Sequence, residues 1–291
     1  MKNKINFPGI KINQSLAALS TFNIGGLADF FYEAQNEKDL LTLVKLAQEK
    51  KMSFVIIGGG SNLLFDDLGF RGLVIKMADD SLKIEGEKIT VGAGIVLGKL
   101  VNFCARKGLA GLEFAAGVPG TVGGAIFGNA GAWQESLGEK VLRVKVLDKN
   151  GEIKWLEQKD CQFEYRNSLF KKENLIILSL ELLLKKEDSQ IIKQKIEENL
   201  NKRLSQPKEP SAGSVFINPK PDSAGVMIEK CGLKGKQIGG AKISEQHANF
   251  IINTGRAKAS DVLELIALVK KKVKEQFKID LKTEIKFLKE K

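Results

Sequence analysis

The stretch FVIIGGGSNLL, at residues 54–64, places three glycines directly after a short apolar run. The apolar run is typical of a buried strand. Glycines permit positive φ, so successive backbone N–H groups can point into one concavity and approach an anion closely. Ser61 and Asn62 follow the glycines directly and add a hydroxyl and an amide as hydrogen-bond donors. The stretch predicts either a pyrophosphate-binding loop or a tight turn without a ligand, and its candidate contacts are Gly58, Gly59, Gly60, Ser61 and Asn62.

This loop does not match the common nucleotide-binding fingerprints. In the pattern G-x-G-x-x-G the third glycine would fall at position 63, where the chain has leucine. The pattern G-x-x-x-x-G-K-[ST] does not occur either. The sequence therefore predicts neither a nicotinamide site of the Rossmann type nor a P-loop.

A second glycine-rich stretch, LEFAAGVPGTVGGA, runs over residues 112–125. Small residues in continuous series let backbones pack tightly, or let a flat ligand lie against the chain. Two such stretches, one suited to an anion and one to a flat ring, indicate an extended dinucleotide with a planar ring. Close helix packing remains the alternative. The candidate contacts here are Gly117, Pro119, Gly120, Thr121, Gly123 and Gly124.

Around these stretches, strands and helices are mixed without regular βα alternation, which predicts an α+β class. Apolar spacing predicts helices over residues 37–50, 95–107, 188–204 and 260–277, a hairpin over 141–156 and a last strand over 281–287. The segment 206–211 holds two prolines and is typical of a boundary.

The composition limits the function classes. The net charge of +11 would suit a nucleic-acid-binding protein, but the lysines are scattered along amphipathic helices, which favours solvated surfaces and anionic small molecules. Cys104, Cys161 and Cys231 form no C-x-x-C pattern, so neither a zinc site nor a disulfide framework is predicted, and no metal is expected. With no membrane-spanning run and no secretory signal, we expect a cytoplasmic protein.

The two glycine-rich stretches resemble the flavin-binding loops of the UDP-N-acetylenolpyruvoylglucosamine reductase family. The resemblance covers nearly the whole chain, because further motifs follow in the family's order and spacing. They are Thr21-Phe22-Asn23-Ile24-Gly25-Gly26, residues 58–64 and 111–132, Tyr165-Arg166-Asn167-Ser168, residues 210–216, 224–235 and 244–253, and Thr283-Glu284-Ile285.

The resemblance implies an FAD-binding domain of the vanillyl-alcohol-oxidase (PCMH) type, made of two α+β subdomains, and a C-terminal α+β substrate domain. The expected boundaries are 1–71 and 72–205 for the subdomains and 206–291 for the substrate domain, with the last strand returning to the flavin domain. The implied activity is NADPH-dependent reduction of UDP-N-acetylglucosamine enolpyruvate through bound FAD, in peptidoglycan precursor synthesis. The chain resembles the short form of the family, and we expect a monomer that inserts into no membrane.

The resemblance also implies the catalytic residues. Arg166 would stabilise the negative charge that develops on the substrate carboxylate, since a guanidinium is always charged and offers paired donors. Ser214 would protonate the carbon next to that carboxylate, and Glu284 would help position or share the proton. Arg203, Asn218 and Asn249 are further candidates for substrate binding.

Two positions depart from the family pattern. The family's Phe-Lys-Asn-Pro motif has isoleucine at position 217, so a positive charge is lost, and Gly128 stands where a larger residue is usual. A flavin oxidase of the same fold, reoxidised by oxygen, is the main alternative. The motifs around Ser214 and Glu284 favour the reductase.

Overall fold

The computed structural model describes residues 7–289 and divides the chain into two compact units. The first unit comprises Tyr32–Gly59 and Val74–Arg203, with residues at the chain's start. The second comprises Gly9–Phe31, Gly60–Leu73 and Leu204–Lys291. Strands β2 (Leu27–Ala34) and β5 (Phe70–Met77) are continuous through the division. The predicted α+β class is confirmed.

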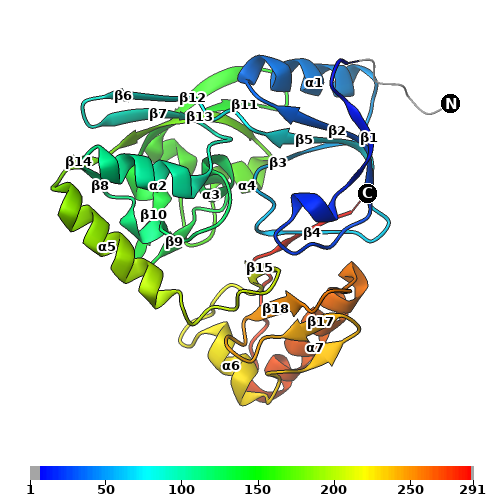
Figure 1. Ribbon diagram of the computed structural model, residues 1–291. Helices are drawn as coiled ribbons and strands as arrows, with labels where there is room; N and C mark the ends of the chain where they lie inside the picture. Colours follow the sequence, from blue (N-terminus) through cyan, green and yellow to red (C-terminus); the bar gives the residue numbers. More distant parts are fainter. Residues whose placement is uncertain (1–6, 290–291) are drawn as a thin grey trace. The chain divides into compact units, whose positions relative to one another are not determined.

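A five-stranded antiparallel sheet forms the centre of the first unit, in the order β12-β11-β13-β7-β6 (Figure 1). The predicted hairpin is confirmed, with Val144 opposite Leu156. Strand β13 lies in the middle, and its central side chains are buried. The sheet strands are β6 (Leu82–Glu85), β7 (Lys88–Gly92), β11 (Val141–Leu147), β12 (Ile153–Glu157) and β13 (Ile176–Leu183).

Helices of the first unit follow the predicted apolar spacing. In α1 the buried residues Leu40, Leu43, Val44 and Ala47 recur at helical spacing, and the side chain of Asn36 accepts a hydrogen bond from the backbone N–H of Asp39 as an N-cap. The helices are α1 (Glu37–Glu49), α2 (Leu97–Arg106), α3 (Val122–Phe127), α4 (Leu169–Glu173) and α5 (Ser189–Lys202). The remaining strands are β3 (Phe54–Ile57), β8 (Leu109–Ala110), β9 (Gly131–Ala132), β10 (Glu135–Ser136) and β14 (Lys185–Lys186).

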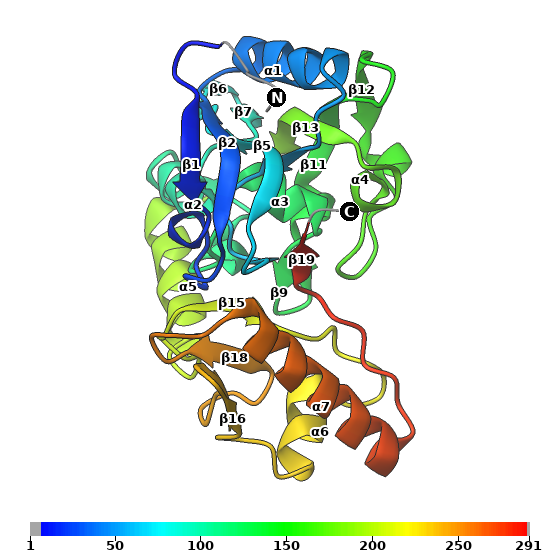
Figure 2. The same cartoon turned by 90° about the vertical axis from the view of Figure 1, so that its right-hand side faces the viewer.

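The second unit has a four-stranded sheet in the order β15-β18-β17-β16, with α6 and α7 on one side of it (Figure 2). Its core joins Phe22 and Leu64, from early parts of the chain, to apolar residues of α6 and α7. The elements are β1 (Lys11–Ser15), β4 (Leu63–Phe65), β15 (Ser211–Ser214), α6 (Ala224–Lys230), β16 (Gln237–Ile238), β17 (Ala241–Ile243), β18 (Phe250–Asn253), α7 (Ala259–Phe277) and β19 (Lys286–Leu288).

The last strand differs from its prediction, because β19 begins at Lys286 and not near residue 281. The preceding residues change partners along the chain. The N–H of Ile217 donates to the carbonyl of Lys282, the N–H of Glu284 donates to the carbonyl of Val215, and β19 then pairs in parallel with β4. An extended segment that switches partners forms no single ladder. The predicted domain boundaries stay predictions.

Candidate active site

The two glycine-rich stretches meet in the first unit. A Cβ on Gly58 would overlap Oγ1 of Thr121, and a Cβ on Gly59 would lie 2.7 Å from Cα of Gly120. Such distances are too short for real side chains, so Gly59 can touch the backbone of Gly120, and Gly58 the side chain of Thr121, only because both positions are glycine. Two glycine clusters that are far apart in sequence thus form one surface, which is what a backbone cradle for an extended ligand requires.

The second stretch is held by hydrogen bonds on both sides. The N–H of Leu97 donates to the carbonyl of Gly120 (3.0 Å), and the N–H of Val122 donates to the carbonyl of Ile95 (2.9 Å). Gly117 and Gly120 have φ of +75° and +113°, which other residues rarely adopt. The stretch is therefore rigid and free of bulky side chains at its turns. These features fit the flavin that the sequence predicts.

The first stretch continues into the second unit at Gly60, whose φ is +67°. A Cβ at this position would collide with the carbonyl of Leu19. Two residues later, the side-chain amide of Asn62 donates to the carbonyl of Glu284 (3.2 Å), while the carbonyl of Asn62 accepts from the N–H of Lys286 (3.0 Å). The end of the loop is thereby tied to the segment that carries the predicted glutamate.

Arg166 lies at a tight turn of the first unit. The N–H and carbonyl of Glu164 exchange hydrogen bonds with those of Asn167 (3.1 Å each), and Arg166 itself has φ of +55°. Two side chains fasten this turn to the residues at and after the end of α3: Ser168 donates to the carbonyl of Phe127 (2.7 Å), and Asn129 donates to the carbonyl of Glu164 (2.9 Å). Because α3 begins in the second glycine-rich stretch, Arg166 has a fixed place relative to it.

Ser214 and Glu284 are neighbours in the second unit. Ser214 is the last residue of β15, opposite Phe250 of β18. The next residue, Val215, accepts a backbone hydrogen bond from the N–H of Glu284 (2.8 Å). Both Ser214 and Glu284 are half-buried. The backbone thus brings together two segments whose residues lie 70 positions apart in sequence, and a shared role of the Ser214 and Glu284 side chains in proton transfer stays a prediction.

The buried side chain of Asn249 supports the segment that follows Ser214. Its oxygen accepts from the N–H of Phe216 (2.9 Å), and its nitrogen donates to the carbonyl of Phe216 (2.8 Å). Asn218 is exposed, and its side-chain oxygen accepts from the N–H of Ala224 (3.0 Å). Both asparagines therefore order backbone around Ser214, and a direct contact of either with substrate stays a prediction.

Arg203, predicted to bind substrate, lies in the first unit against the second glycine-rich stretch. Its Nε donates to the carbonyl of Ala116 (2.8 Å). Burial lowers the pKa of its guanidinium, and the positive charge of Arg166 lowers it further. The structure thus brings Arg203 and Arg166 together in one unit, while Ser214 and Glu284 lie together in the other. That these two groups face one substrate stays a prediction.

The other reactive side chains behave as structural groups. The ring of His247 packs edge-on against Phe250, and its Nδ1 accepts from the N–H of Asn249 (3.2 Å). Burial lowers the pKa of His247. Burial also raises the pKa of the Cys104 and Cys161 thiols to about 12, so both stay protonated and unreactive.

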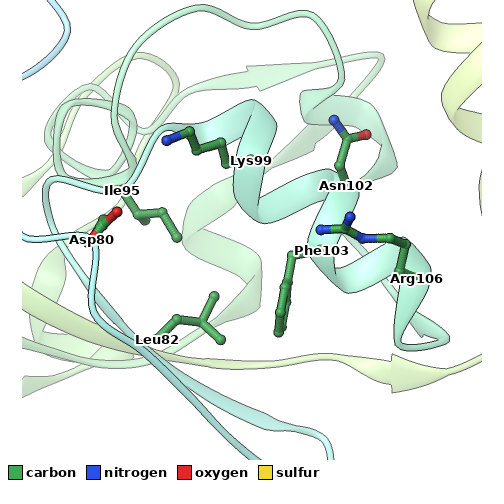
Figure 3. A pocket seen from close by; sticks show the side chains of 7 residues that line it. All are labelled: Asp80, Leu82, Ile95, Lys99, Asn102, Phe103 and Arg106. Atoms are coloured by element: carbon green, nitrogen blue, oxygen red, sulfur yellow. The ribbon is translucent and has the colours of Figure 1, made fainter.

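Two open grooves flank α2, and no predicted site residue lines either. The larger, of about 650 Å³, has an apolar floor of Leu82, Ile95 and Phe103, with Lys99 and Arg106 at its rim (Figure 3). Within residues 7–289, no group of three or more metal-ligating side chains gathers, and no helix is long and apolar enough to cross a membrane.

Sequence reasoning missed the residues that hold the predicted ones. Asn129 and Ser168 act through hydrogen bonds to backbone groups far away in sequence, which no local pattern predicts. Trp133 was also missed, although its ring is 45% exposed and both Lys202 and Arg203 lie against it. At Gly128, where the family usually has a larger residue, an added Cβ would meet only the carbonyl of Gly124, at 3.7 Å.

Two family models match different parts of the chain. A sequence model described as FAD binding domain matches residues 28–157, and one described as UDP-N-acetylenolpyruvoylglucosamine reductase, C-terminal domain, matches residues 206–288. The first match includes both glycine-rich stretches, and the second includes Ser214 and Glu284.

Similar proteins extend over almost the whole chain. A UDP-N-acetylenolpyruvoylglucosamine reductase of Halalkalibacterium halodurans is 45% identical, over 96% of this chain and 94% of its own. That of Bacillus subtilis is 43% identical, over 95% and 93%. The crystal structure of the reductase from Thermus caldophilus matches with a TM-score of 0.82 at 33% identity, over 96% of this chain and 97% of its own.

Proposed function

The chain belongs to the UDP-N-acetylenolpyruvoylglucosamine reductase family, and from this premise we propose which of its residues carry each part of the reaction. The protein is an FAD-dependent oxidoreductase that reduces the enolpyruvyl group of UDP-N-acetylglucosamine enolpyruvate in peptidoglycan precursor synthesis. The observation that carries the assignment of roles is the backbone hydrogen bond that links Glu284 to Val215, the residue after Ser214.

The two glycine-rich stretches hold the FAD. Gly59 lies directly on the backbone of Gly120, and Gly58 faces the small side chain of Thr121, so no bulky group separates the cofactor from backbone N–H groups and carbonyls. When bound, the flavin supplies hydride transfer, and the protein supplies orientation and electrostatics. Ser61, Asn62, Gly117, Pro119, Gly123 and Gly124 complete the proposed contacts.

Arg166 binds the substrate carboxylate. Addition of hydride to the terminal carbon of the enolpyruvyl group builds negative charge on the neighbouring carbon and on the carboxylate. A guanidinium fixed by a closed turn can meet that charge with two parallel donors, without reorganisation at the moment of reaction. The hydrogen bonds of Ser168 and Asn129 keep the turn closed.

Ser214 gives a proton to the carbon on which this charge develops. A serine hydroxyl is a weak acid, so it needs a neighbour that stabilises the resulting oxygen or replaces the proton. Glu284 is the proposed neighbour, and the hydrogen bond of its N–H to the carbonyl of Val215, the residue after Ser214, supports this choice. We assign His247 no part in this step, because its ring packs against Phe250 and its Nδ1 accepts from the N–H of Asn249.

We propose NADPH as the reductant, and a cytoplasmic monomer as the working form. The positive net charge of +11 favours anionic small molecules such as NADPH and a UDP-sugar. The same charge would also attract nucleic acid. Binding of the purified protein to DNA or RNA at moderate salt, where weak non-specific contacts are lost, would contradict this part of the proposal.

The function is tested by anaerobic spectroscopy of the purified protein. We expect a flavin absorption band that NADPH bleaches and that UDP-N-acetylglucosamine enolpyruvate restores, with UDP-N-acetylmuramate as product. In the competing reading, an oxidase, air would restore the band faster than substrate does. A protein without flavin and without affinity for FAD would contradict the proposal entirely.

A further inference from the structure

Arg203 is the last residue of the first unit and caps the C-terminal end of α5. Its Nε donates to the carbonyl of Ala116 (2.8 Å), and one Nη donates to the carbonyl of Phe114 (3.4 Å). Its side chain also lies over Gly117, where an added Cβ would come within 2.9 Å of Cδ of Arg203. One arginine thus contacts residues 114–117, in the first half of the second glycine-rich stretch.

The backbone of this loop donates no hydrogen bond to the two carbonyls that Arg203 binds. A single 3₁₀ turn is formed by the N–H groups of Ala115, Ala116 and Val118, which donate to the carbonyls of Leu112, Glu113 and Ala115. In the part of the chain that the structure describes, the carbonyls of Phe114 and Ala116 accept no backbone hydrogen bond. A buried carbonyl without a donor destabilises the fold. The guanidinium of Arg203 therefore supplies the donors that the turn leaves missing at Phe114 and Ala116.

The charge of Arg203 is balanced by dipoles and a ring. Within residues 7–289 it forms no ion pair with a carboxylate. Its Cζ lies 5.9 Å from the ring centroid of Trp133, in the turn between β9 and β10, which is within the range of a cation–π contact. Nζ of Lys202 lies 5.2 Å from the same ring. Both donors of Arg203 that bind the loop are therefore engaged within the protein.

We propose that Arg203 is a positioning residue that fixes residues 114–117, and through them the flavin-binding stretch, instead of binding the diphosphate of a substrate. The inference rests on the proposed function, because it takes this stretch as the flavin site. Without the guanidinium, two carbonyls lose their donors and Gly117 loses the side chain that covers it. The loop then samples other conformations, and FAD binds less tightly.

Three variants test this role. Arg203→Met keeps the apolar stem and removes both donors. Arg203→Lys keeps the charge but has a point-like ammonium in place of two donors in fixed directions, so it should restore binding only in part. Lys202→Met is the matched control, since it removes the other cation from the Trp133 ring and leaves the bonds to the loop intact.

The readouts are the FAD dissociation constant, the shape of the flavin absorption band and the two KM values. For Arg203→Met we expect affinity for FAD to fall about tenfold or more, as for a lost charged hydrogen bond. Millimolar guanidinium chloride should restore part of the lost affinity for FAD. With FAD saturating, KM for NADPH and for the UDP-sugar should stay within about threefold, because the loop and not the substrate is touched. Lys202→Met should behave as wild type.

The opposite pattern overturns the inference. Unchanged FAD affinity and band shape, with a raised KM for either substrate, would make Arg203 a direct substrate contact. No change in any readout would also refute it. Should Arg203→Met fail to fold, Arg203→Lys carries the same test. Failure of the wild-type protein to bind FAD would instead refute the proposed function, so the two failures are distinguishable.

Discussion

The surroundings of Arg166 in the first unit and those of Ser214 and Glu284 in the second are built by different means. Around Arg166, side chains bind carbonyls: Ser168 and Asn129 hold the turn. Next to Ser214, a backbone hydrogen bond joins the two segments, because the carbonyl of Val215 accepts from the N–H of Glu284. The comparison indicates that two side chains fasten the turn of Arg166, while backbone bonds and a single side chain, that of Asn249, order the surroundings of Ser214 and Glu284. The following predictions test this difference.

The largest effect is expected from Arg166→Met. Loss of a charged donor aimed at developing charge typically lowers turnover by about 10²–10³-fold. Bleaching of the flavin by NADPH should persist, since the substrate carboxylate plays no part in it. The measurement is stopped-flow absorbance of each half-reaction. Arg106→Met, on the exposed face of α2, is the control and should leave both rates unchanged. Equal slowing of both half-reactions would contradict the assigned role.

The next largest effect concerns the cradle. In Gly59→Ala the new Cβ would lie 2.7 Å from Cα of Gly120, and backbone cannot yield as a flexible side chain can. We expect FAD affinity to fall about 10–100-fold, in line with the usual cost of overpacking. Gly98→Ala, in α2 with open space around it, is the control and should bind FAD normally. Titration of the apoprotein with FAD measures both, and equal affinities would contradict the cradle.

Local sequence predicted the elements well and their partners less well. The spacing of Leu40, Leu43, Val44 and Ala47 predicted α1, because helix amphipathicity is a local property. The glycines predicted a cradle, because only glycine permits such turns. The parallel pairing of β19 with β4 was beyond prediction, since register between strands 220 residues apart depends on the packing of the whole unit.

A middle-sized effect on stability is expected from Asn249→Ala. It leaves the buried N–H and carbonyl of Phe216 without partners, which should lower the free energy of unfolding by about 1–3 kcal/mol. Asn218→Ala, which removes one bond at an exposed position, should cost less than about 1 kcal/mol. Urea unfolding compares the two. Equal stabilities would contradict the supporting role given to Asn249.

The smallest effect is a pH dependence from His247. Burial lowers the pKa of His247 in the folded protein, so the unfolded chain, with a pKa of about 6.5, binds the proton more readily. The stabilising contribution is present above about pH 6.5 and is lost as the pH falls toward the folded pKa. His247→Gln should lose less stability than wild type between about pH 6.5 and 5. Parallel pH profiles for the two proteins would contradict this.

The site shows the same division between what was predictable and what was not. Arg166, Ser214 and Glu284 were predicted from motif resemblance, because their chemistry restricts residue type. The bonds of Arg203 to Ala116 and of Asn249 to Phe216 were not, since a polar side chain in sequence carries no record of which distant carbonyl it will meet. Prediction from sequence therefore named candidate reacting groups, and it named Arg203 and Asn249 without the hydrogen bonds that these two residues form.

The most direct test of this account is an anaerobic two-step experiment on Ser214→Ala. The backbone holds residue 214 in place, so removing its hydroxyl should leave the fold and the cradle unchanged. NADPH should bleach the flavin of the variant at the wild-type rate, and UDP-N-acetylglucosamine enolpyruvate should then restore the absorption at least about 100-fold more slowly, as expected when a general acid is lost. Recovery of the band at the wild-type rate would contradict the account.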